Sequence, residues 1–433
     1  MTTISRRDLG MGAGAGLGAA LASGAGLGTF AIAQNAAKVV VIGGGPGGAT
    51  VANRLKRDAP QLDVTLIEPA TRYATCFFSN LYLGGFRGYD QQLHGYDGIA
   101  ALGVRVVHDR AGSIDIAARM VRTLGGTAFA YDRLVVAPGI EIKYGQIEGY
   151  SREASARMPH AYIAGTQTEL LKRQLDAMPD GGTVLIAPPG NPYRCPPGPY
   201  ERACLIAHYL KTRKPKSKLV IYDPKNAFSK QELFTEAFRK YYDGIVELNL
   251  TNEIDDFGLA RVDAAAMTVT TKAGETVKAD VINVIPNQRA GDIALAAGLG
   301  DGDWCPVDPV SFASRKARDV YVLGDAAIGA DMPKSAFSAN SQAKVVATDI
   351  VASLAGKARP EPGPEPSLGN ICWSMLAPDD SVKLGAGYLP KGGKLEAVGP
   401  FISKAGEGAA VRKATYEESV VWYGAFIEDV FGR

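Results

Sequence analysis

Histidine and cysteine are scarce in this sequence of 433 residues, which has four histidines and five cysteines. No spacing among them matches a structural zinc site, where cysteine and histidine ligands come in closely spaced pairs. None forms the C-x-x-C-H motif that attaches a c-type haem. We therefore expect the chain to bind no metal and to carry no haem of its own. If it gives up electrons one at a time, a second polypeptide must accept them.

The sequence also lacks a strong charge imbalance and any long run of one sign. Its 47 basic and 45 acidic residues give a formal net charge of +2. A protein that binds nucleic acid usually shows a basic cluster, so we do not expect a nucleic-acid partner. The apolar content of 46% and the charged content of 21% are ordinary for a well-packed protein. The length allows two or three domains.

Near the amino terminus, Arg6 and Arg7 are followed by an uncharged, glycine-rich stretch that ends at residues 31–33, which read Ala-Ile-Ala. A twin-arginine pair, a weakly apolar segment and a small-x-small site are the parts of an export signal. We therefore expect residues 1–33 to be a twin-arginine signal peptide, and the protein to be periplasmic after export in the folded state. A membrane anchor is the alternative, because the run is long enough to span a bilayer, but its frequent glycines make it poorly apolar.

A glycine turn follows the apolar strand expected at residues 38–42. Gly43, Gly45 and Gly48 have the G-x-G-x-x-G spacing, which gives a tight turn, room for a pyrophosphate and close packing of the next helix on the strand. A second expected strand ends about 20 residues later in Glu68, where a carboxylate can accept hydrogen bonds from a ribose. Together these features predict a dinucleotide-binding βαβ unit.

Two later segments favour FAD as the dinucleotide. Residues 131–139 resemble the strand and turn that leave the first nucleotide unit of flavoproteins with two dinucleotide-binding domains. Residues 319–325 resemble the second FAD fingerprint of that class, an apolar strand followed by Gly324 and by Asp325, which would hold the ribityl chain. A helix that begins near Lys334 completes the expected flavin site. We therefore expect an α/β, glutathione-reductase-like fold with two dinucleotide-binding domains and a smaller C-terminal α+β segment.

In the middle of the chain, proline stands where a glycine turn would bind NAD(P)H. Expected strands at residues 183–187 and 218–223, with a helix at 203–211 between them, repeat the βαβ pattern. The turn at residues 188–200 is rich in proline. Proline has no N–H to offer a phosphate, and its ring fills the space that glycine leaves. We therefore expect a middle domain without a nucleotide site, electrons that do not come from NADH, and a stiff loop that presents Cys195.

These motifs resemble the flavoprotein subunit of flavocytochrome c sulfide dehydrogenase. The resemblance covers nearly all of the chain after residue 33. Besides the glycine turn it rests on residues 68–69, 73–80, 94–98, 194–202, 304–308, 333–335 and 371–378. It implies an FAD enzyme that oxidises sulfide to sulfur or polysulfide and passes electrons to a c-type cytochrome subunit, which would carry the haem.

The resemblance also implies residue roles. Cys76 resembles the cysteine that forms a thioether to the flavin, so FAD would be covalently held. Cys195 and Cys372 resemble a redox-active disulfide beside the flavin ring. Glu201 resembles the acid that handles protons at that site.

Structural roles stay open for the same residues. A bridge between Cys195 and Cys372 would also staple the C-terminal segment to the middle domain. Cys76 is consistent with an inert core thiol, and Glu201 with a charge that complements the dipole of its helix. Trp422 lies in an apolar and aromatic helix expected at residues 419–426, and it is expected to pack rather than to react. The two remaining cysteines are expected to be buried thiols without an assigned role: Cys204 and Cys305.

The expected organisation has three domains after the signal. They are an FAD-binding domain at residues 36–148 and 286–360, a middle domain at 149–285, and a C-terminal domain at 361–433 that carries Cys372, preceded by a stiff proline-rich linker at 358–366. Three other functions stay open: a sulfide:quinone oxidoreductase, an electron-relay flavoprotein subunit without sulfide chemistry, and a pyridine-nucleotide-dependent disulfide reductase.

Overall fold

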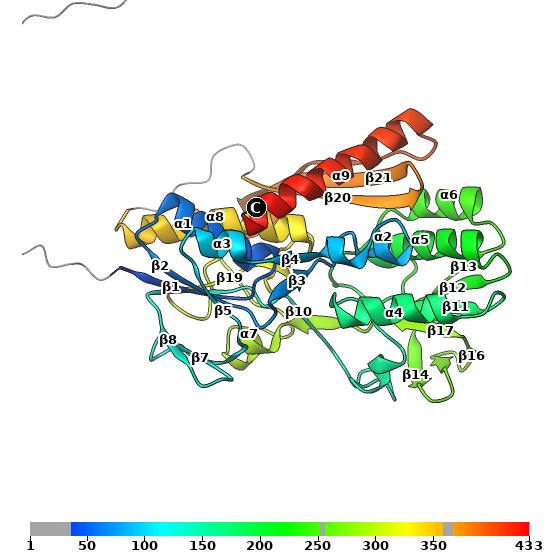
Figure 1. Ribbon diagram of the computed structural model, residues 1–433, viewed down its shortest axis with the longest axis horizontal. Helices are drawn as coiled ribbons and strands as arrows, with labels where there is room; N and C mark the ends of the chain where they lie inside the picture. The colour runs from blue at the N-terminus through cyan, green and yellow to red at the C-terminus, as the bar shows by residue number, and fades with distance from the viewer. Residues whose placement is uncertain (1–35, 252–255, 358–366, 433) are drawn as a thin grey trace, which may run out of the picture. The chain divides into compact units, whose positions relative to one another are not determined.

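A five-stranded parallel sheet carries the glycine turn (Figure 1). The computed structural model describes residues 36–251, 256–357 and 367–432, so the expected signal peptide at 1–33 and the expected linker at 358–366 lie outside the described residues. The strands read as aliphatic and β-branched runs, typical of strands buried on both faces. Their order is β19 (Val320–Val322), β9 (Arg133–Val136), β1 (Lys38–Ile42), β2 (Asp63–Ile67) and β5 (Arg105–Val107).

Helix α1 (Pro46–Asp58) covers this sheet together with α8 (Ala336–Leu354), against which it packs (Figure 1). The sequence predicted both helices. α1 begins earlier than expected because a proline is tolerated in the first turn of a helix, where its missing N–H has no partner to lose. The side chain of Ser335 caps α8 by accepting a hydrogen bond from the backbone N–H of Ser338 at 3.0 Å.

The middle of the chain forms a second parallel sheet. Its order is β13 (Val246–Leu250), β12 (Lys218–Asp223), β11 (Thr183–Ala187) and β17 (Val281–Val284). Three helices belong to this part of the chain: α4 (Thr166–Ala177), α5 (Gly198–Arg213) and α6 (Gln231–Tyr241). The expected strands at 183–187 and 218–223 are confirmed, and the expected helix at 203–211 is the central part of α5.

The C-terminal segment is α+β, as expected, and consists of an antiparallel sheet and one helix that is longer than the sequence predicted. The sheet consists of β20 (Leu368–Ala377), β21 (Asp380–Lys391) and β22 (Lys394–Ile402), in that order. Helix α9 (Ala409–Phe431) contacts β20 and β21 (Figure 1), and α5, α6 and α8 contact β20. The strand that carries Cys372 therefore lies against helices from both parallel-sheet regions.

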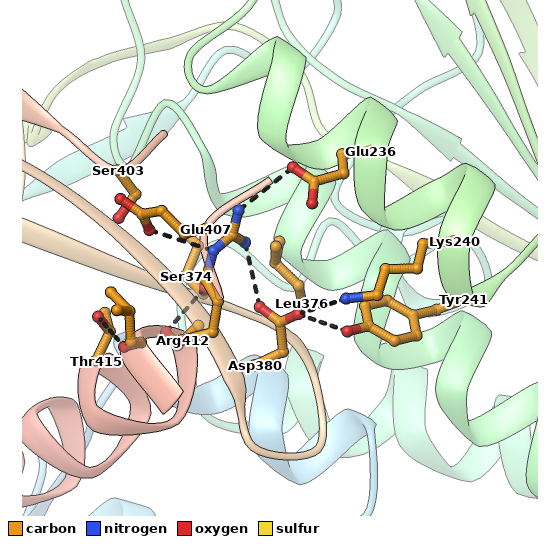
Figure 2. Close-up of polar contacts among 12 residues, drawn as sticks. Glu236, Lys240, Tyr241, Ser374, Leu376, Asp380, Ser403, Glu407, Arg412 and Thr415 are labelled. Atoms are coloured by element: carbon orange, nitrogen blue, oxygen red, sulfur yellow. Dashed lines mark hydrogen bonds and ion pairs between the residues drawn. The ribbon is translucent and has the colours of Figure 1, made fainter. Parts of the chain in front are cut away.

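A buried arginine ties the C-terminal segment to α6 (Figure 2). Arg412 of α9 has a side chain that is only 3% exposed, and it forms ion pairs with Glu236 at 3.3 Å, Asp380 at 3.2 Å and Glu407 at 3.3 Å. The hydroxyl of Tyr241 donates a hydrogen bond to Asp380 at 2.6 Å. Because a buried charge is costly without its partners, this network holds α6, β21 and α9 in register.

Shorter elements complete the described chain. They are β3 (Arg72–Ala74), α2 (Ser79–Leu83), β4 (Leu93–Gly95), α3 (Asp97–Ala101), β6 (Ala111–Asp115), β7 (Met120–Thr123), β8 (Ala128–Ala130), β10 (Ile140–Ile142), β14 (Leu259–Asp263), β15 (Thr268–Thr271), β16 (Thr276–Lys278), β18 (Gln288–Ala290) and α7 (Asp292–Ala296), with 3-10 turns at Tyr89–Gln92, Ala154–Ala156 and Gly324–Ala326. Within the described ranges, no helix combines the length and the apolar character needed to cross a bilayer.

Candidate active site

The glycine turn borders a cavity of about 690 Å³ at the carboxyl ends of β1, β2 and β19. This is the edge at which open parallel sheets bind ligands. The cavity is lined by most of the residues that the sequence predicted for the cofactor: Gly43, Gly45, Glu68, Cys76, Gly324 and Asp325. The structure therefore brings together residues that are up to 282 positions apart in the chain.

Two glycines of the turn have no room for a side chain. Gly43 has φ +98°, and a Cβ atom there would lie 2.3 Å from the carbonyl oxygen of Ala137. A Cβ atom on Gly48 would lie 1.9 Å from the carbonyl oxygen of Gly43. Gly48 does not line the cavity, and its role is the close packing of α1 on the turn. A side chain at either position would distort the turn, which borders the cavity through Gly43 and Gly45.

The carboxylate of Glu68 is fixed at the edge of this cavity. Its Oε2 accepts a hydrogen bond from the backbone N–H of Gly44 at 2.8 Å, and its Oε1 accepts one from Ala70 at 2.9 Å. The side chain thus closes the turn, and a ribose contact by Glu68 stays a prediction.

Two buried polar atoms in the wall of the cavity have no hydrogen-bond partner among the described residues. They are Oδ1 of Asp325 and Nη2 of Arg194. The other carboxylate oxygen of Asp325 lies 3.6 Å from Nη1 of Arg194. Since buried polar groups are nearly always hydrogen-bonded, both atoms point to a polar ligand. The glycine turn, the carboxylate of Glu68 and these two groups fit the polar parts of FAD.

Lys334 holds neighbouring segments of this region together through its side chain and its backbone. Its Nζ donates hydrogen bonds to the carbonyl oxygens of Asp325 at 2.7 Å and Ala327 at 2.8 Å, and it lies 3.8 Å from the ring centre of Trp304. Its carbonyl oxygen accepts a hydrogen bond from the N–H of Cys195 at 2.9 Å. Lys334 is not among the residues that line the cavity, so a direct contact with the cofactor stays a prediction.

A second cavity, of about 110 Å³, adjoins the first and shares Cys76 and Arg194 with it. Cys195, Cys372 and Glu201 line this second cavity. We call it the cysteine pocket. All five cysteines are free thiols in the structure, and a disulfide between Cys195 and Cys372 stays a prediction. The fold brings these two thiols, Glu201 and Cys76 to one small cavity. It adjoins the larger cavity at the glycine turn, which we call the FAD-type cavity.

The backbone of Cys195 is held in an unusual conformation. Its φ is +55°, in the left-handed region that residues other than glycine rarely adopt. Its carbonyl oxygen accepts hydrogen bonds from the N–H of Gly198 at 2.8 Å and from the hydroxyl of Tyr162 at 3.2 Å. Phe78, which lines the same pocket, also has a positive φ, of 65°. Such conformations cluster at functional sites, where the surroundings enforce them.

Cys372 lies on β20 in a polar setting. Its Sγ is 3.4 Å from Nδ2 of Asn370, which is placed to donate to it. The Oδ1 of Asn370 accepts a hydrogen bond from the hydroxyl of Ser335 at 2.6 Å, at the amino terminus of α8. Oδ1 of Asn370 also lies 3.6 Å from Sγ, where it can accept from the thiol, so Asn370 can bond to the sulfur in either protonation state.

Glu201 lies in the first turn of α5, as the sequence predicted, and its carboxylate accepts two hydrogen bonds. The donors are Nδ2 of Asn80 at 2.7 Å and the backbone N–H of Met375 at 2.9 Å. Burial raises the pKa of Glu201 above its ordinary value, although these two hydrogen bonds act in the opposite direction. A carboxyl group with a raised pKa is suited to exchanging protons near neutral pH.

Burial raises the pKa of both thiols in the pocket, but their neighbours differ. For Cys195, the negative charge that Cys372 and Glu201 can carry raises the pKa further. For Cys372, the ammonium group of Lys230 and the hydrogen bond from Asn370 act against burial. The two sulfurs are therefore electrostatically unequal.

Lys230 is a residue that the sequence analysis missed. It is 5% exposed and precedes α6 with a φ of 62°. Its Nζ donates hydrogen bonds to the carbonyl oxygen of Cys372 at 2.7 Å and to the hydroxyl of Ser374 at 2.9 Å. Burial lowers the pKa of Lys230 to about 8, against the opposing effect of Cys372 and Glu201. No local pattern in the sequence marks this lysine as different from those on the surface.

Aromatic side chains form the other wall of the cysteine pocket. Trp422 of α9 stacks near Trp373, with ring centres 4.9 Å apart, and near Phe337 at 6.0 Å. All three line the pocket, as do Phe77 and Phe78. Trp422 does pack, as expected, and it also faces the site. The two cysteines without an assigned role are fully buried, which confirms that part of the prediction: Cys204 and Cys305.

Among the described residues there is no group of three or more histidine, cysteine, aspartate or glutamate side chains placed to hold a metal ion. The chemistry that the site offers rests on two thiols, a buried carboxyl group, a buried ammonium group and the adjoining cofactor cavity.

Three family models match successive parts of the chain. Residues 37–175 match the pyridine nucleotide-disulphide oxidoreductase model. Residues 168–286 match the central part of the sulfide dehydrogenase [flavocytochrome c] flavoprotein chain, and residues 364–431 match the flavocytochrome c sulphide dehydrogenase flavin-binding model.

Individual relatives agree on sulfide oxidation. The mitochondrial sulfide:quinone oxidoreductase of Mus musculus is 24% identical over 305 residues, 69% of this chain and 67% of its own length. The sulfide dehydrogenase [flavocytochrome c] flavoprotein chain of Chlorobaculum thiosulfatiphilum is 54% identical over 43 residues, 10% of this chain and 90% of that sequence. The sulfide:quinone oxidoreductase structure from Aquifex aeolicus shares the fold, with a TM-score of 0.68, 20% identity, and coverage of 92% of this chain and 93% of that chain. The matches show the pyridine nucleotide-disulphide oxidoreductase fold and a similarity to sulfide-oxidising flavoproteins.

Proposed function

We propose that the chain oxidises sulfide through the pair Cys195 and Cys372 and passes the electrons, by way of FAD, to a c-type cytochrome subunit. One observation carries this proposal: both thiols and Glu201 line a single cavity that adjoins the FAD-type cavity and shares Cys76 and Arg194 with it. A disulfide formed by this pair would take up sulfide beside an acceptor of two electrons.

The sulfur chemistry is an exchange at the disulfide form of the pair. Hydrosulfide attacks one sulfur, a new S–S bond forms to it, the bond between Cys195 and Cys372 breaks, and the other cysteine leaves as a thiolate. The product is one persulfide and one thiolate. We propose that Glu201, which lines the same cavity and is held by Asn80 and Met375, takes the proton of the persulfide.

Bound FAD supplies an acceptor that takes an electron pair and releases the electrons one at a time. The residues that would hold it are the turn glycines Gly43 and Gly45, with Glu68 and Asp325. We propose that Cys76 binds the flavin covalently, because its thiol lies where the two cavities meet.

Two matches support a cytochrome as the acceptor. Residues 168–286 and 364–431 both match models of the flavocytochrome c enzyme. A periplasmic location, expected from residues 1–33, agrees with a cytochrome partner. A quinone is the second candidate, since the relatives from Mus musculus and Aquifex aeolicus are sulfide:quinone oxidoreductases. The aromatic wall formed by Trp373, Trp422 and Phe337 is suited to a flat apolar ring.

The middle domain supports an electron source other than a pyridine nucleotide. Asp223 ends β12, where a nucleotide-binding unit of this type would present an acid to a ribose. Here Asp223 is fully buried, forms an ion pair with Lys225 at 2.6 Å and accepts a hydrogen bond from Tyr200 at 2.5 Å. Its carboxylate is engaged inside the protein.

Anaerobic addition of sulfide to the purified flavoprotein tests the chemistry. We expect the flavin absorbance to bleach in the wild type and in Cys204→Ala, and to persist in Cys195→Ser and Cys372→Ser. Rapid bleaching in Cys195→Ser contradicts the proposal, and absence of bleaching in the wild type favours a relay subunit. The reduced protein is then mixed with cytochrome c or with a soluble quinone analogue, and the faster reoxidation identifies the acceptor class.

A further inference from the structure

Lys230 is buried beside the cysteine pocket without a carboxylate partner. Its Nζ donates to two acceptors, the carbonyl oxygen of Cys372 at 2.7 Å and the hydroxyl of Ser374 at 2.9 Å, and both acceptors are neutral. Within the described ranges no carboxylate lies at ion-pair distance from this ammonium group. A buried charge of this kind is costly unless something nearby can become negative.

One group that can become negative is the sulfur of Cys372, the residue whose carbonyl oxygen Lys230 binds. Lys230 holds the backbone of that residue, and among the groups that favour its ammonium form Cys372 has the largest effect, followed by Glu201 and Cys195. In the other direction, Lys230 is the strongest of the groups that act against burial at the Cys372 thiol.

The other charged and titratable groups around Cys372 do not offer this stabilisation. Glu201 of α5 and Cys195 of the preceding loop can only add negative charge. Tyr388 of β21 is also close enough to interact with the Cys372 thiol, whose negative charge raises the pKa of Tyr388. Asn370 contributes a neutral hydrogen bond to the sulfur. Among the residues that the structure describes, Lys230 is thus the cation whose charge acts on the Cys372 thiol.

We propose that Lys230 is a positioning residue whose ammonium group stabilises the anionic form of the Cys372 sulfur whenever the bond between Cys195 and Cys372 is open. This inference rests on the proposed function. Opening the disulfide with hydrosulfide leaves one cysteine as a thiolate and the other as a persulfide. Whichever of these forms on Cys372, its negative charge interacts favourably with the ammonium group of Lys230, whereas the cation that acts on Cys195 is Arg194.

Thiol alkylation tests the inference without sulfide. The full flavoprotein is reduced, and the rate of Cys372 alkylation by iodoacetamide is followed by peptide mass mapping from neutral to alkaline pH. In Lys230→Met we expect the rate at neutral pH to fall about tenfold or more, the change for one unit of thiol pKa. Lys230→Arg keeps the positive charge and should stay within a few-fold of the wild type.

Lys214→Met is the matched control. Lys214 is also a buried lysine, and its Nζ donates to backbone carbonyl oxygens only, those of Leu175 at 2.6 Å, Asp176 at 2.7 Å and Met178. It follows the carboxyl end of α5, whereas the cysteine pocket lies at the amino end, so Cys372 alkylation should be unchanged. Lys230→Gln, which is also uncharged, replaces Lys230→Met if that variant does not retain flavin.

Equal alkylation rates of Cys372 in the wild type and in the folded, uncharged Lys230 variant overturn the inference. The readout is independent of sulfide oxidation. If sulfide does not bleach the flavin but Cys372 alkylation slows tenfold in the variant, the proposed function is contradicted and the role of Lys230 is supported. If sulfide bleaches the flavin but the alkylation rate of Cys372 is unchanged in the variant, the proposed function is supported and the role of Lys230 is contradicted.

Discussion

The carboxylate of Glu201 accepts a hydrogen bond from the backbone N–H of Met375 at 2.9 Å. This contact joins the first turn of α5, six residues after Cys195, to β20, three residues after Cys372. The acid is therefore positioned by both segments that bring sulfur to the site. Replacing Glu201 by glutamine keeps the shape and removes the exchangeable proton.

We expect Glu201→Gln to slow the sulfide-dependent bleaching of the flavin by about 10²- to 10⁴-fold, the usual effect of losing a general acid–base group. The thiols should also alkylate at lower pH, because the charge of Glu201 raises the pKa of both Cys195 and Cys372. Stopped-flow absorbance measures the first effect and iodoacetamide labelling the second. Glu232→Gln, an exposed glutamate in the first turn of α6, is the control and should change neither. Unaltered bleaching in Glu201→Gln would limit this residue to a structural role.

The elements that the sequence predicted well are those specified by short-range patterns. The strand β1, the glycine turn and α1 follow from an apolar run, glycine spacing and a proline in the first turn. The carboxyl-terminal helix was expected only at residues 419–426, whereas α9 spans Ala409–Phe431, since its first turns carry many polar residues and a weak apolar pattern.

Long-range contacts account for what the sequence could not show. Lys230 bonds to the carbonyl oxygen of Cys372 across 142 positions, and Arg412 reaches Glu236 across 176. Neither residue stands in a pattern that separates it from a surface charge. The resemblance to a known family identified Cys195, Cys372 and Glu201 as chemical groups, but only the fold places a buried ammonium group beside one of the two sulfurs.

The position of Cys76 between the two cavities gives a second test. We expect acid-precipitated wild-type protein to retain its flavin colour and Cys76→Ala to release FAD into the supernatant completely. Intact mass should show one added FAD in the wild type and none in the variant. Cys305→Ala removes a fully buried thiol that lines neither cavity, so it should behave like the wild type. Release of free FAD from the wild type would show that the flavin is held without a covalent bond.

Lys230 should also leave a signature in the pH dependence of stability. Burial lowers its pKa from 10.5 to about 8. Between these values the unfolded chain binds a proton that the folded chain does not, so stability contributed by this residue rises with pH. Below the lower value its burial costs about 3 kcal/mol, the equivalent of the whole shift.

As pH rises through this range, the free energy of unfolding of the wild type should therefore increase by up to about 3 kcal/mol relative to that of Lys230→Met. Urea unfolding of both proteins at several pH values measures the difference. Lys230→Arg stays charged throughout, so the free energy of unfolding of the wild type should increase by a similar amount relative to that of Lys230→Arg. Parallel stability curves for the wild type and Lys230→Met would mean that Lys230 does not change its protonation within this range.

The network around Arg412 predicts a large loss of stability from one substitution (Figure 2). Arg412→Met leaves the buried carboxylate of Asp380 with only Lys240 and Tyr241 as partners, and removing one member of a buried ion pair costs about 3–5 kcal/mol. Lys413→Met is the matched control, since the neighbouring Lys413 pairs with Asp379 at 3.9 Å on the surface, where such a pair contributes about 1 kcal/mol or less. Because Arg412 anchors α9 and β21 to α6, the urea midpoint should fall far more in Arg412→Met than in Lys413→Met, and limited proteolysis should cut first in the C-terminal segment. Equal midpoints for the two variants would show that this segment is held by its apolar contacts and not by the buried charges.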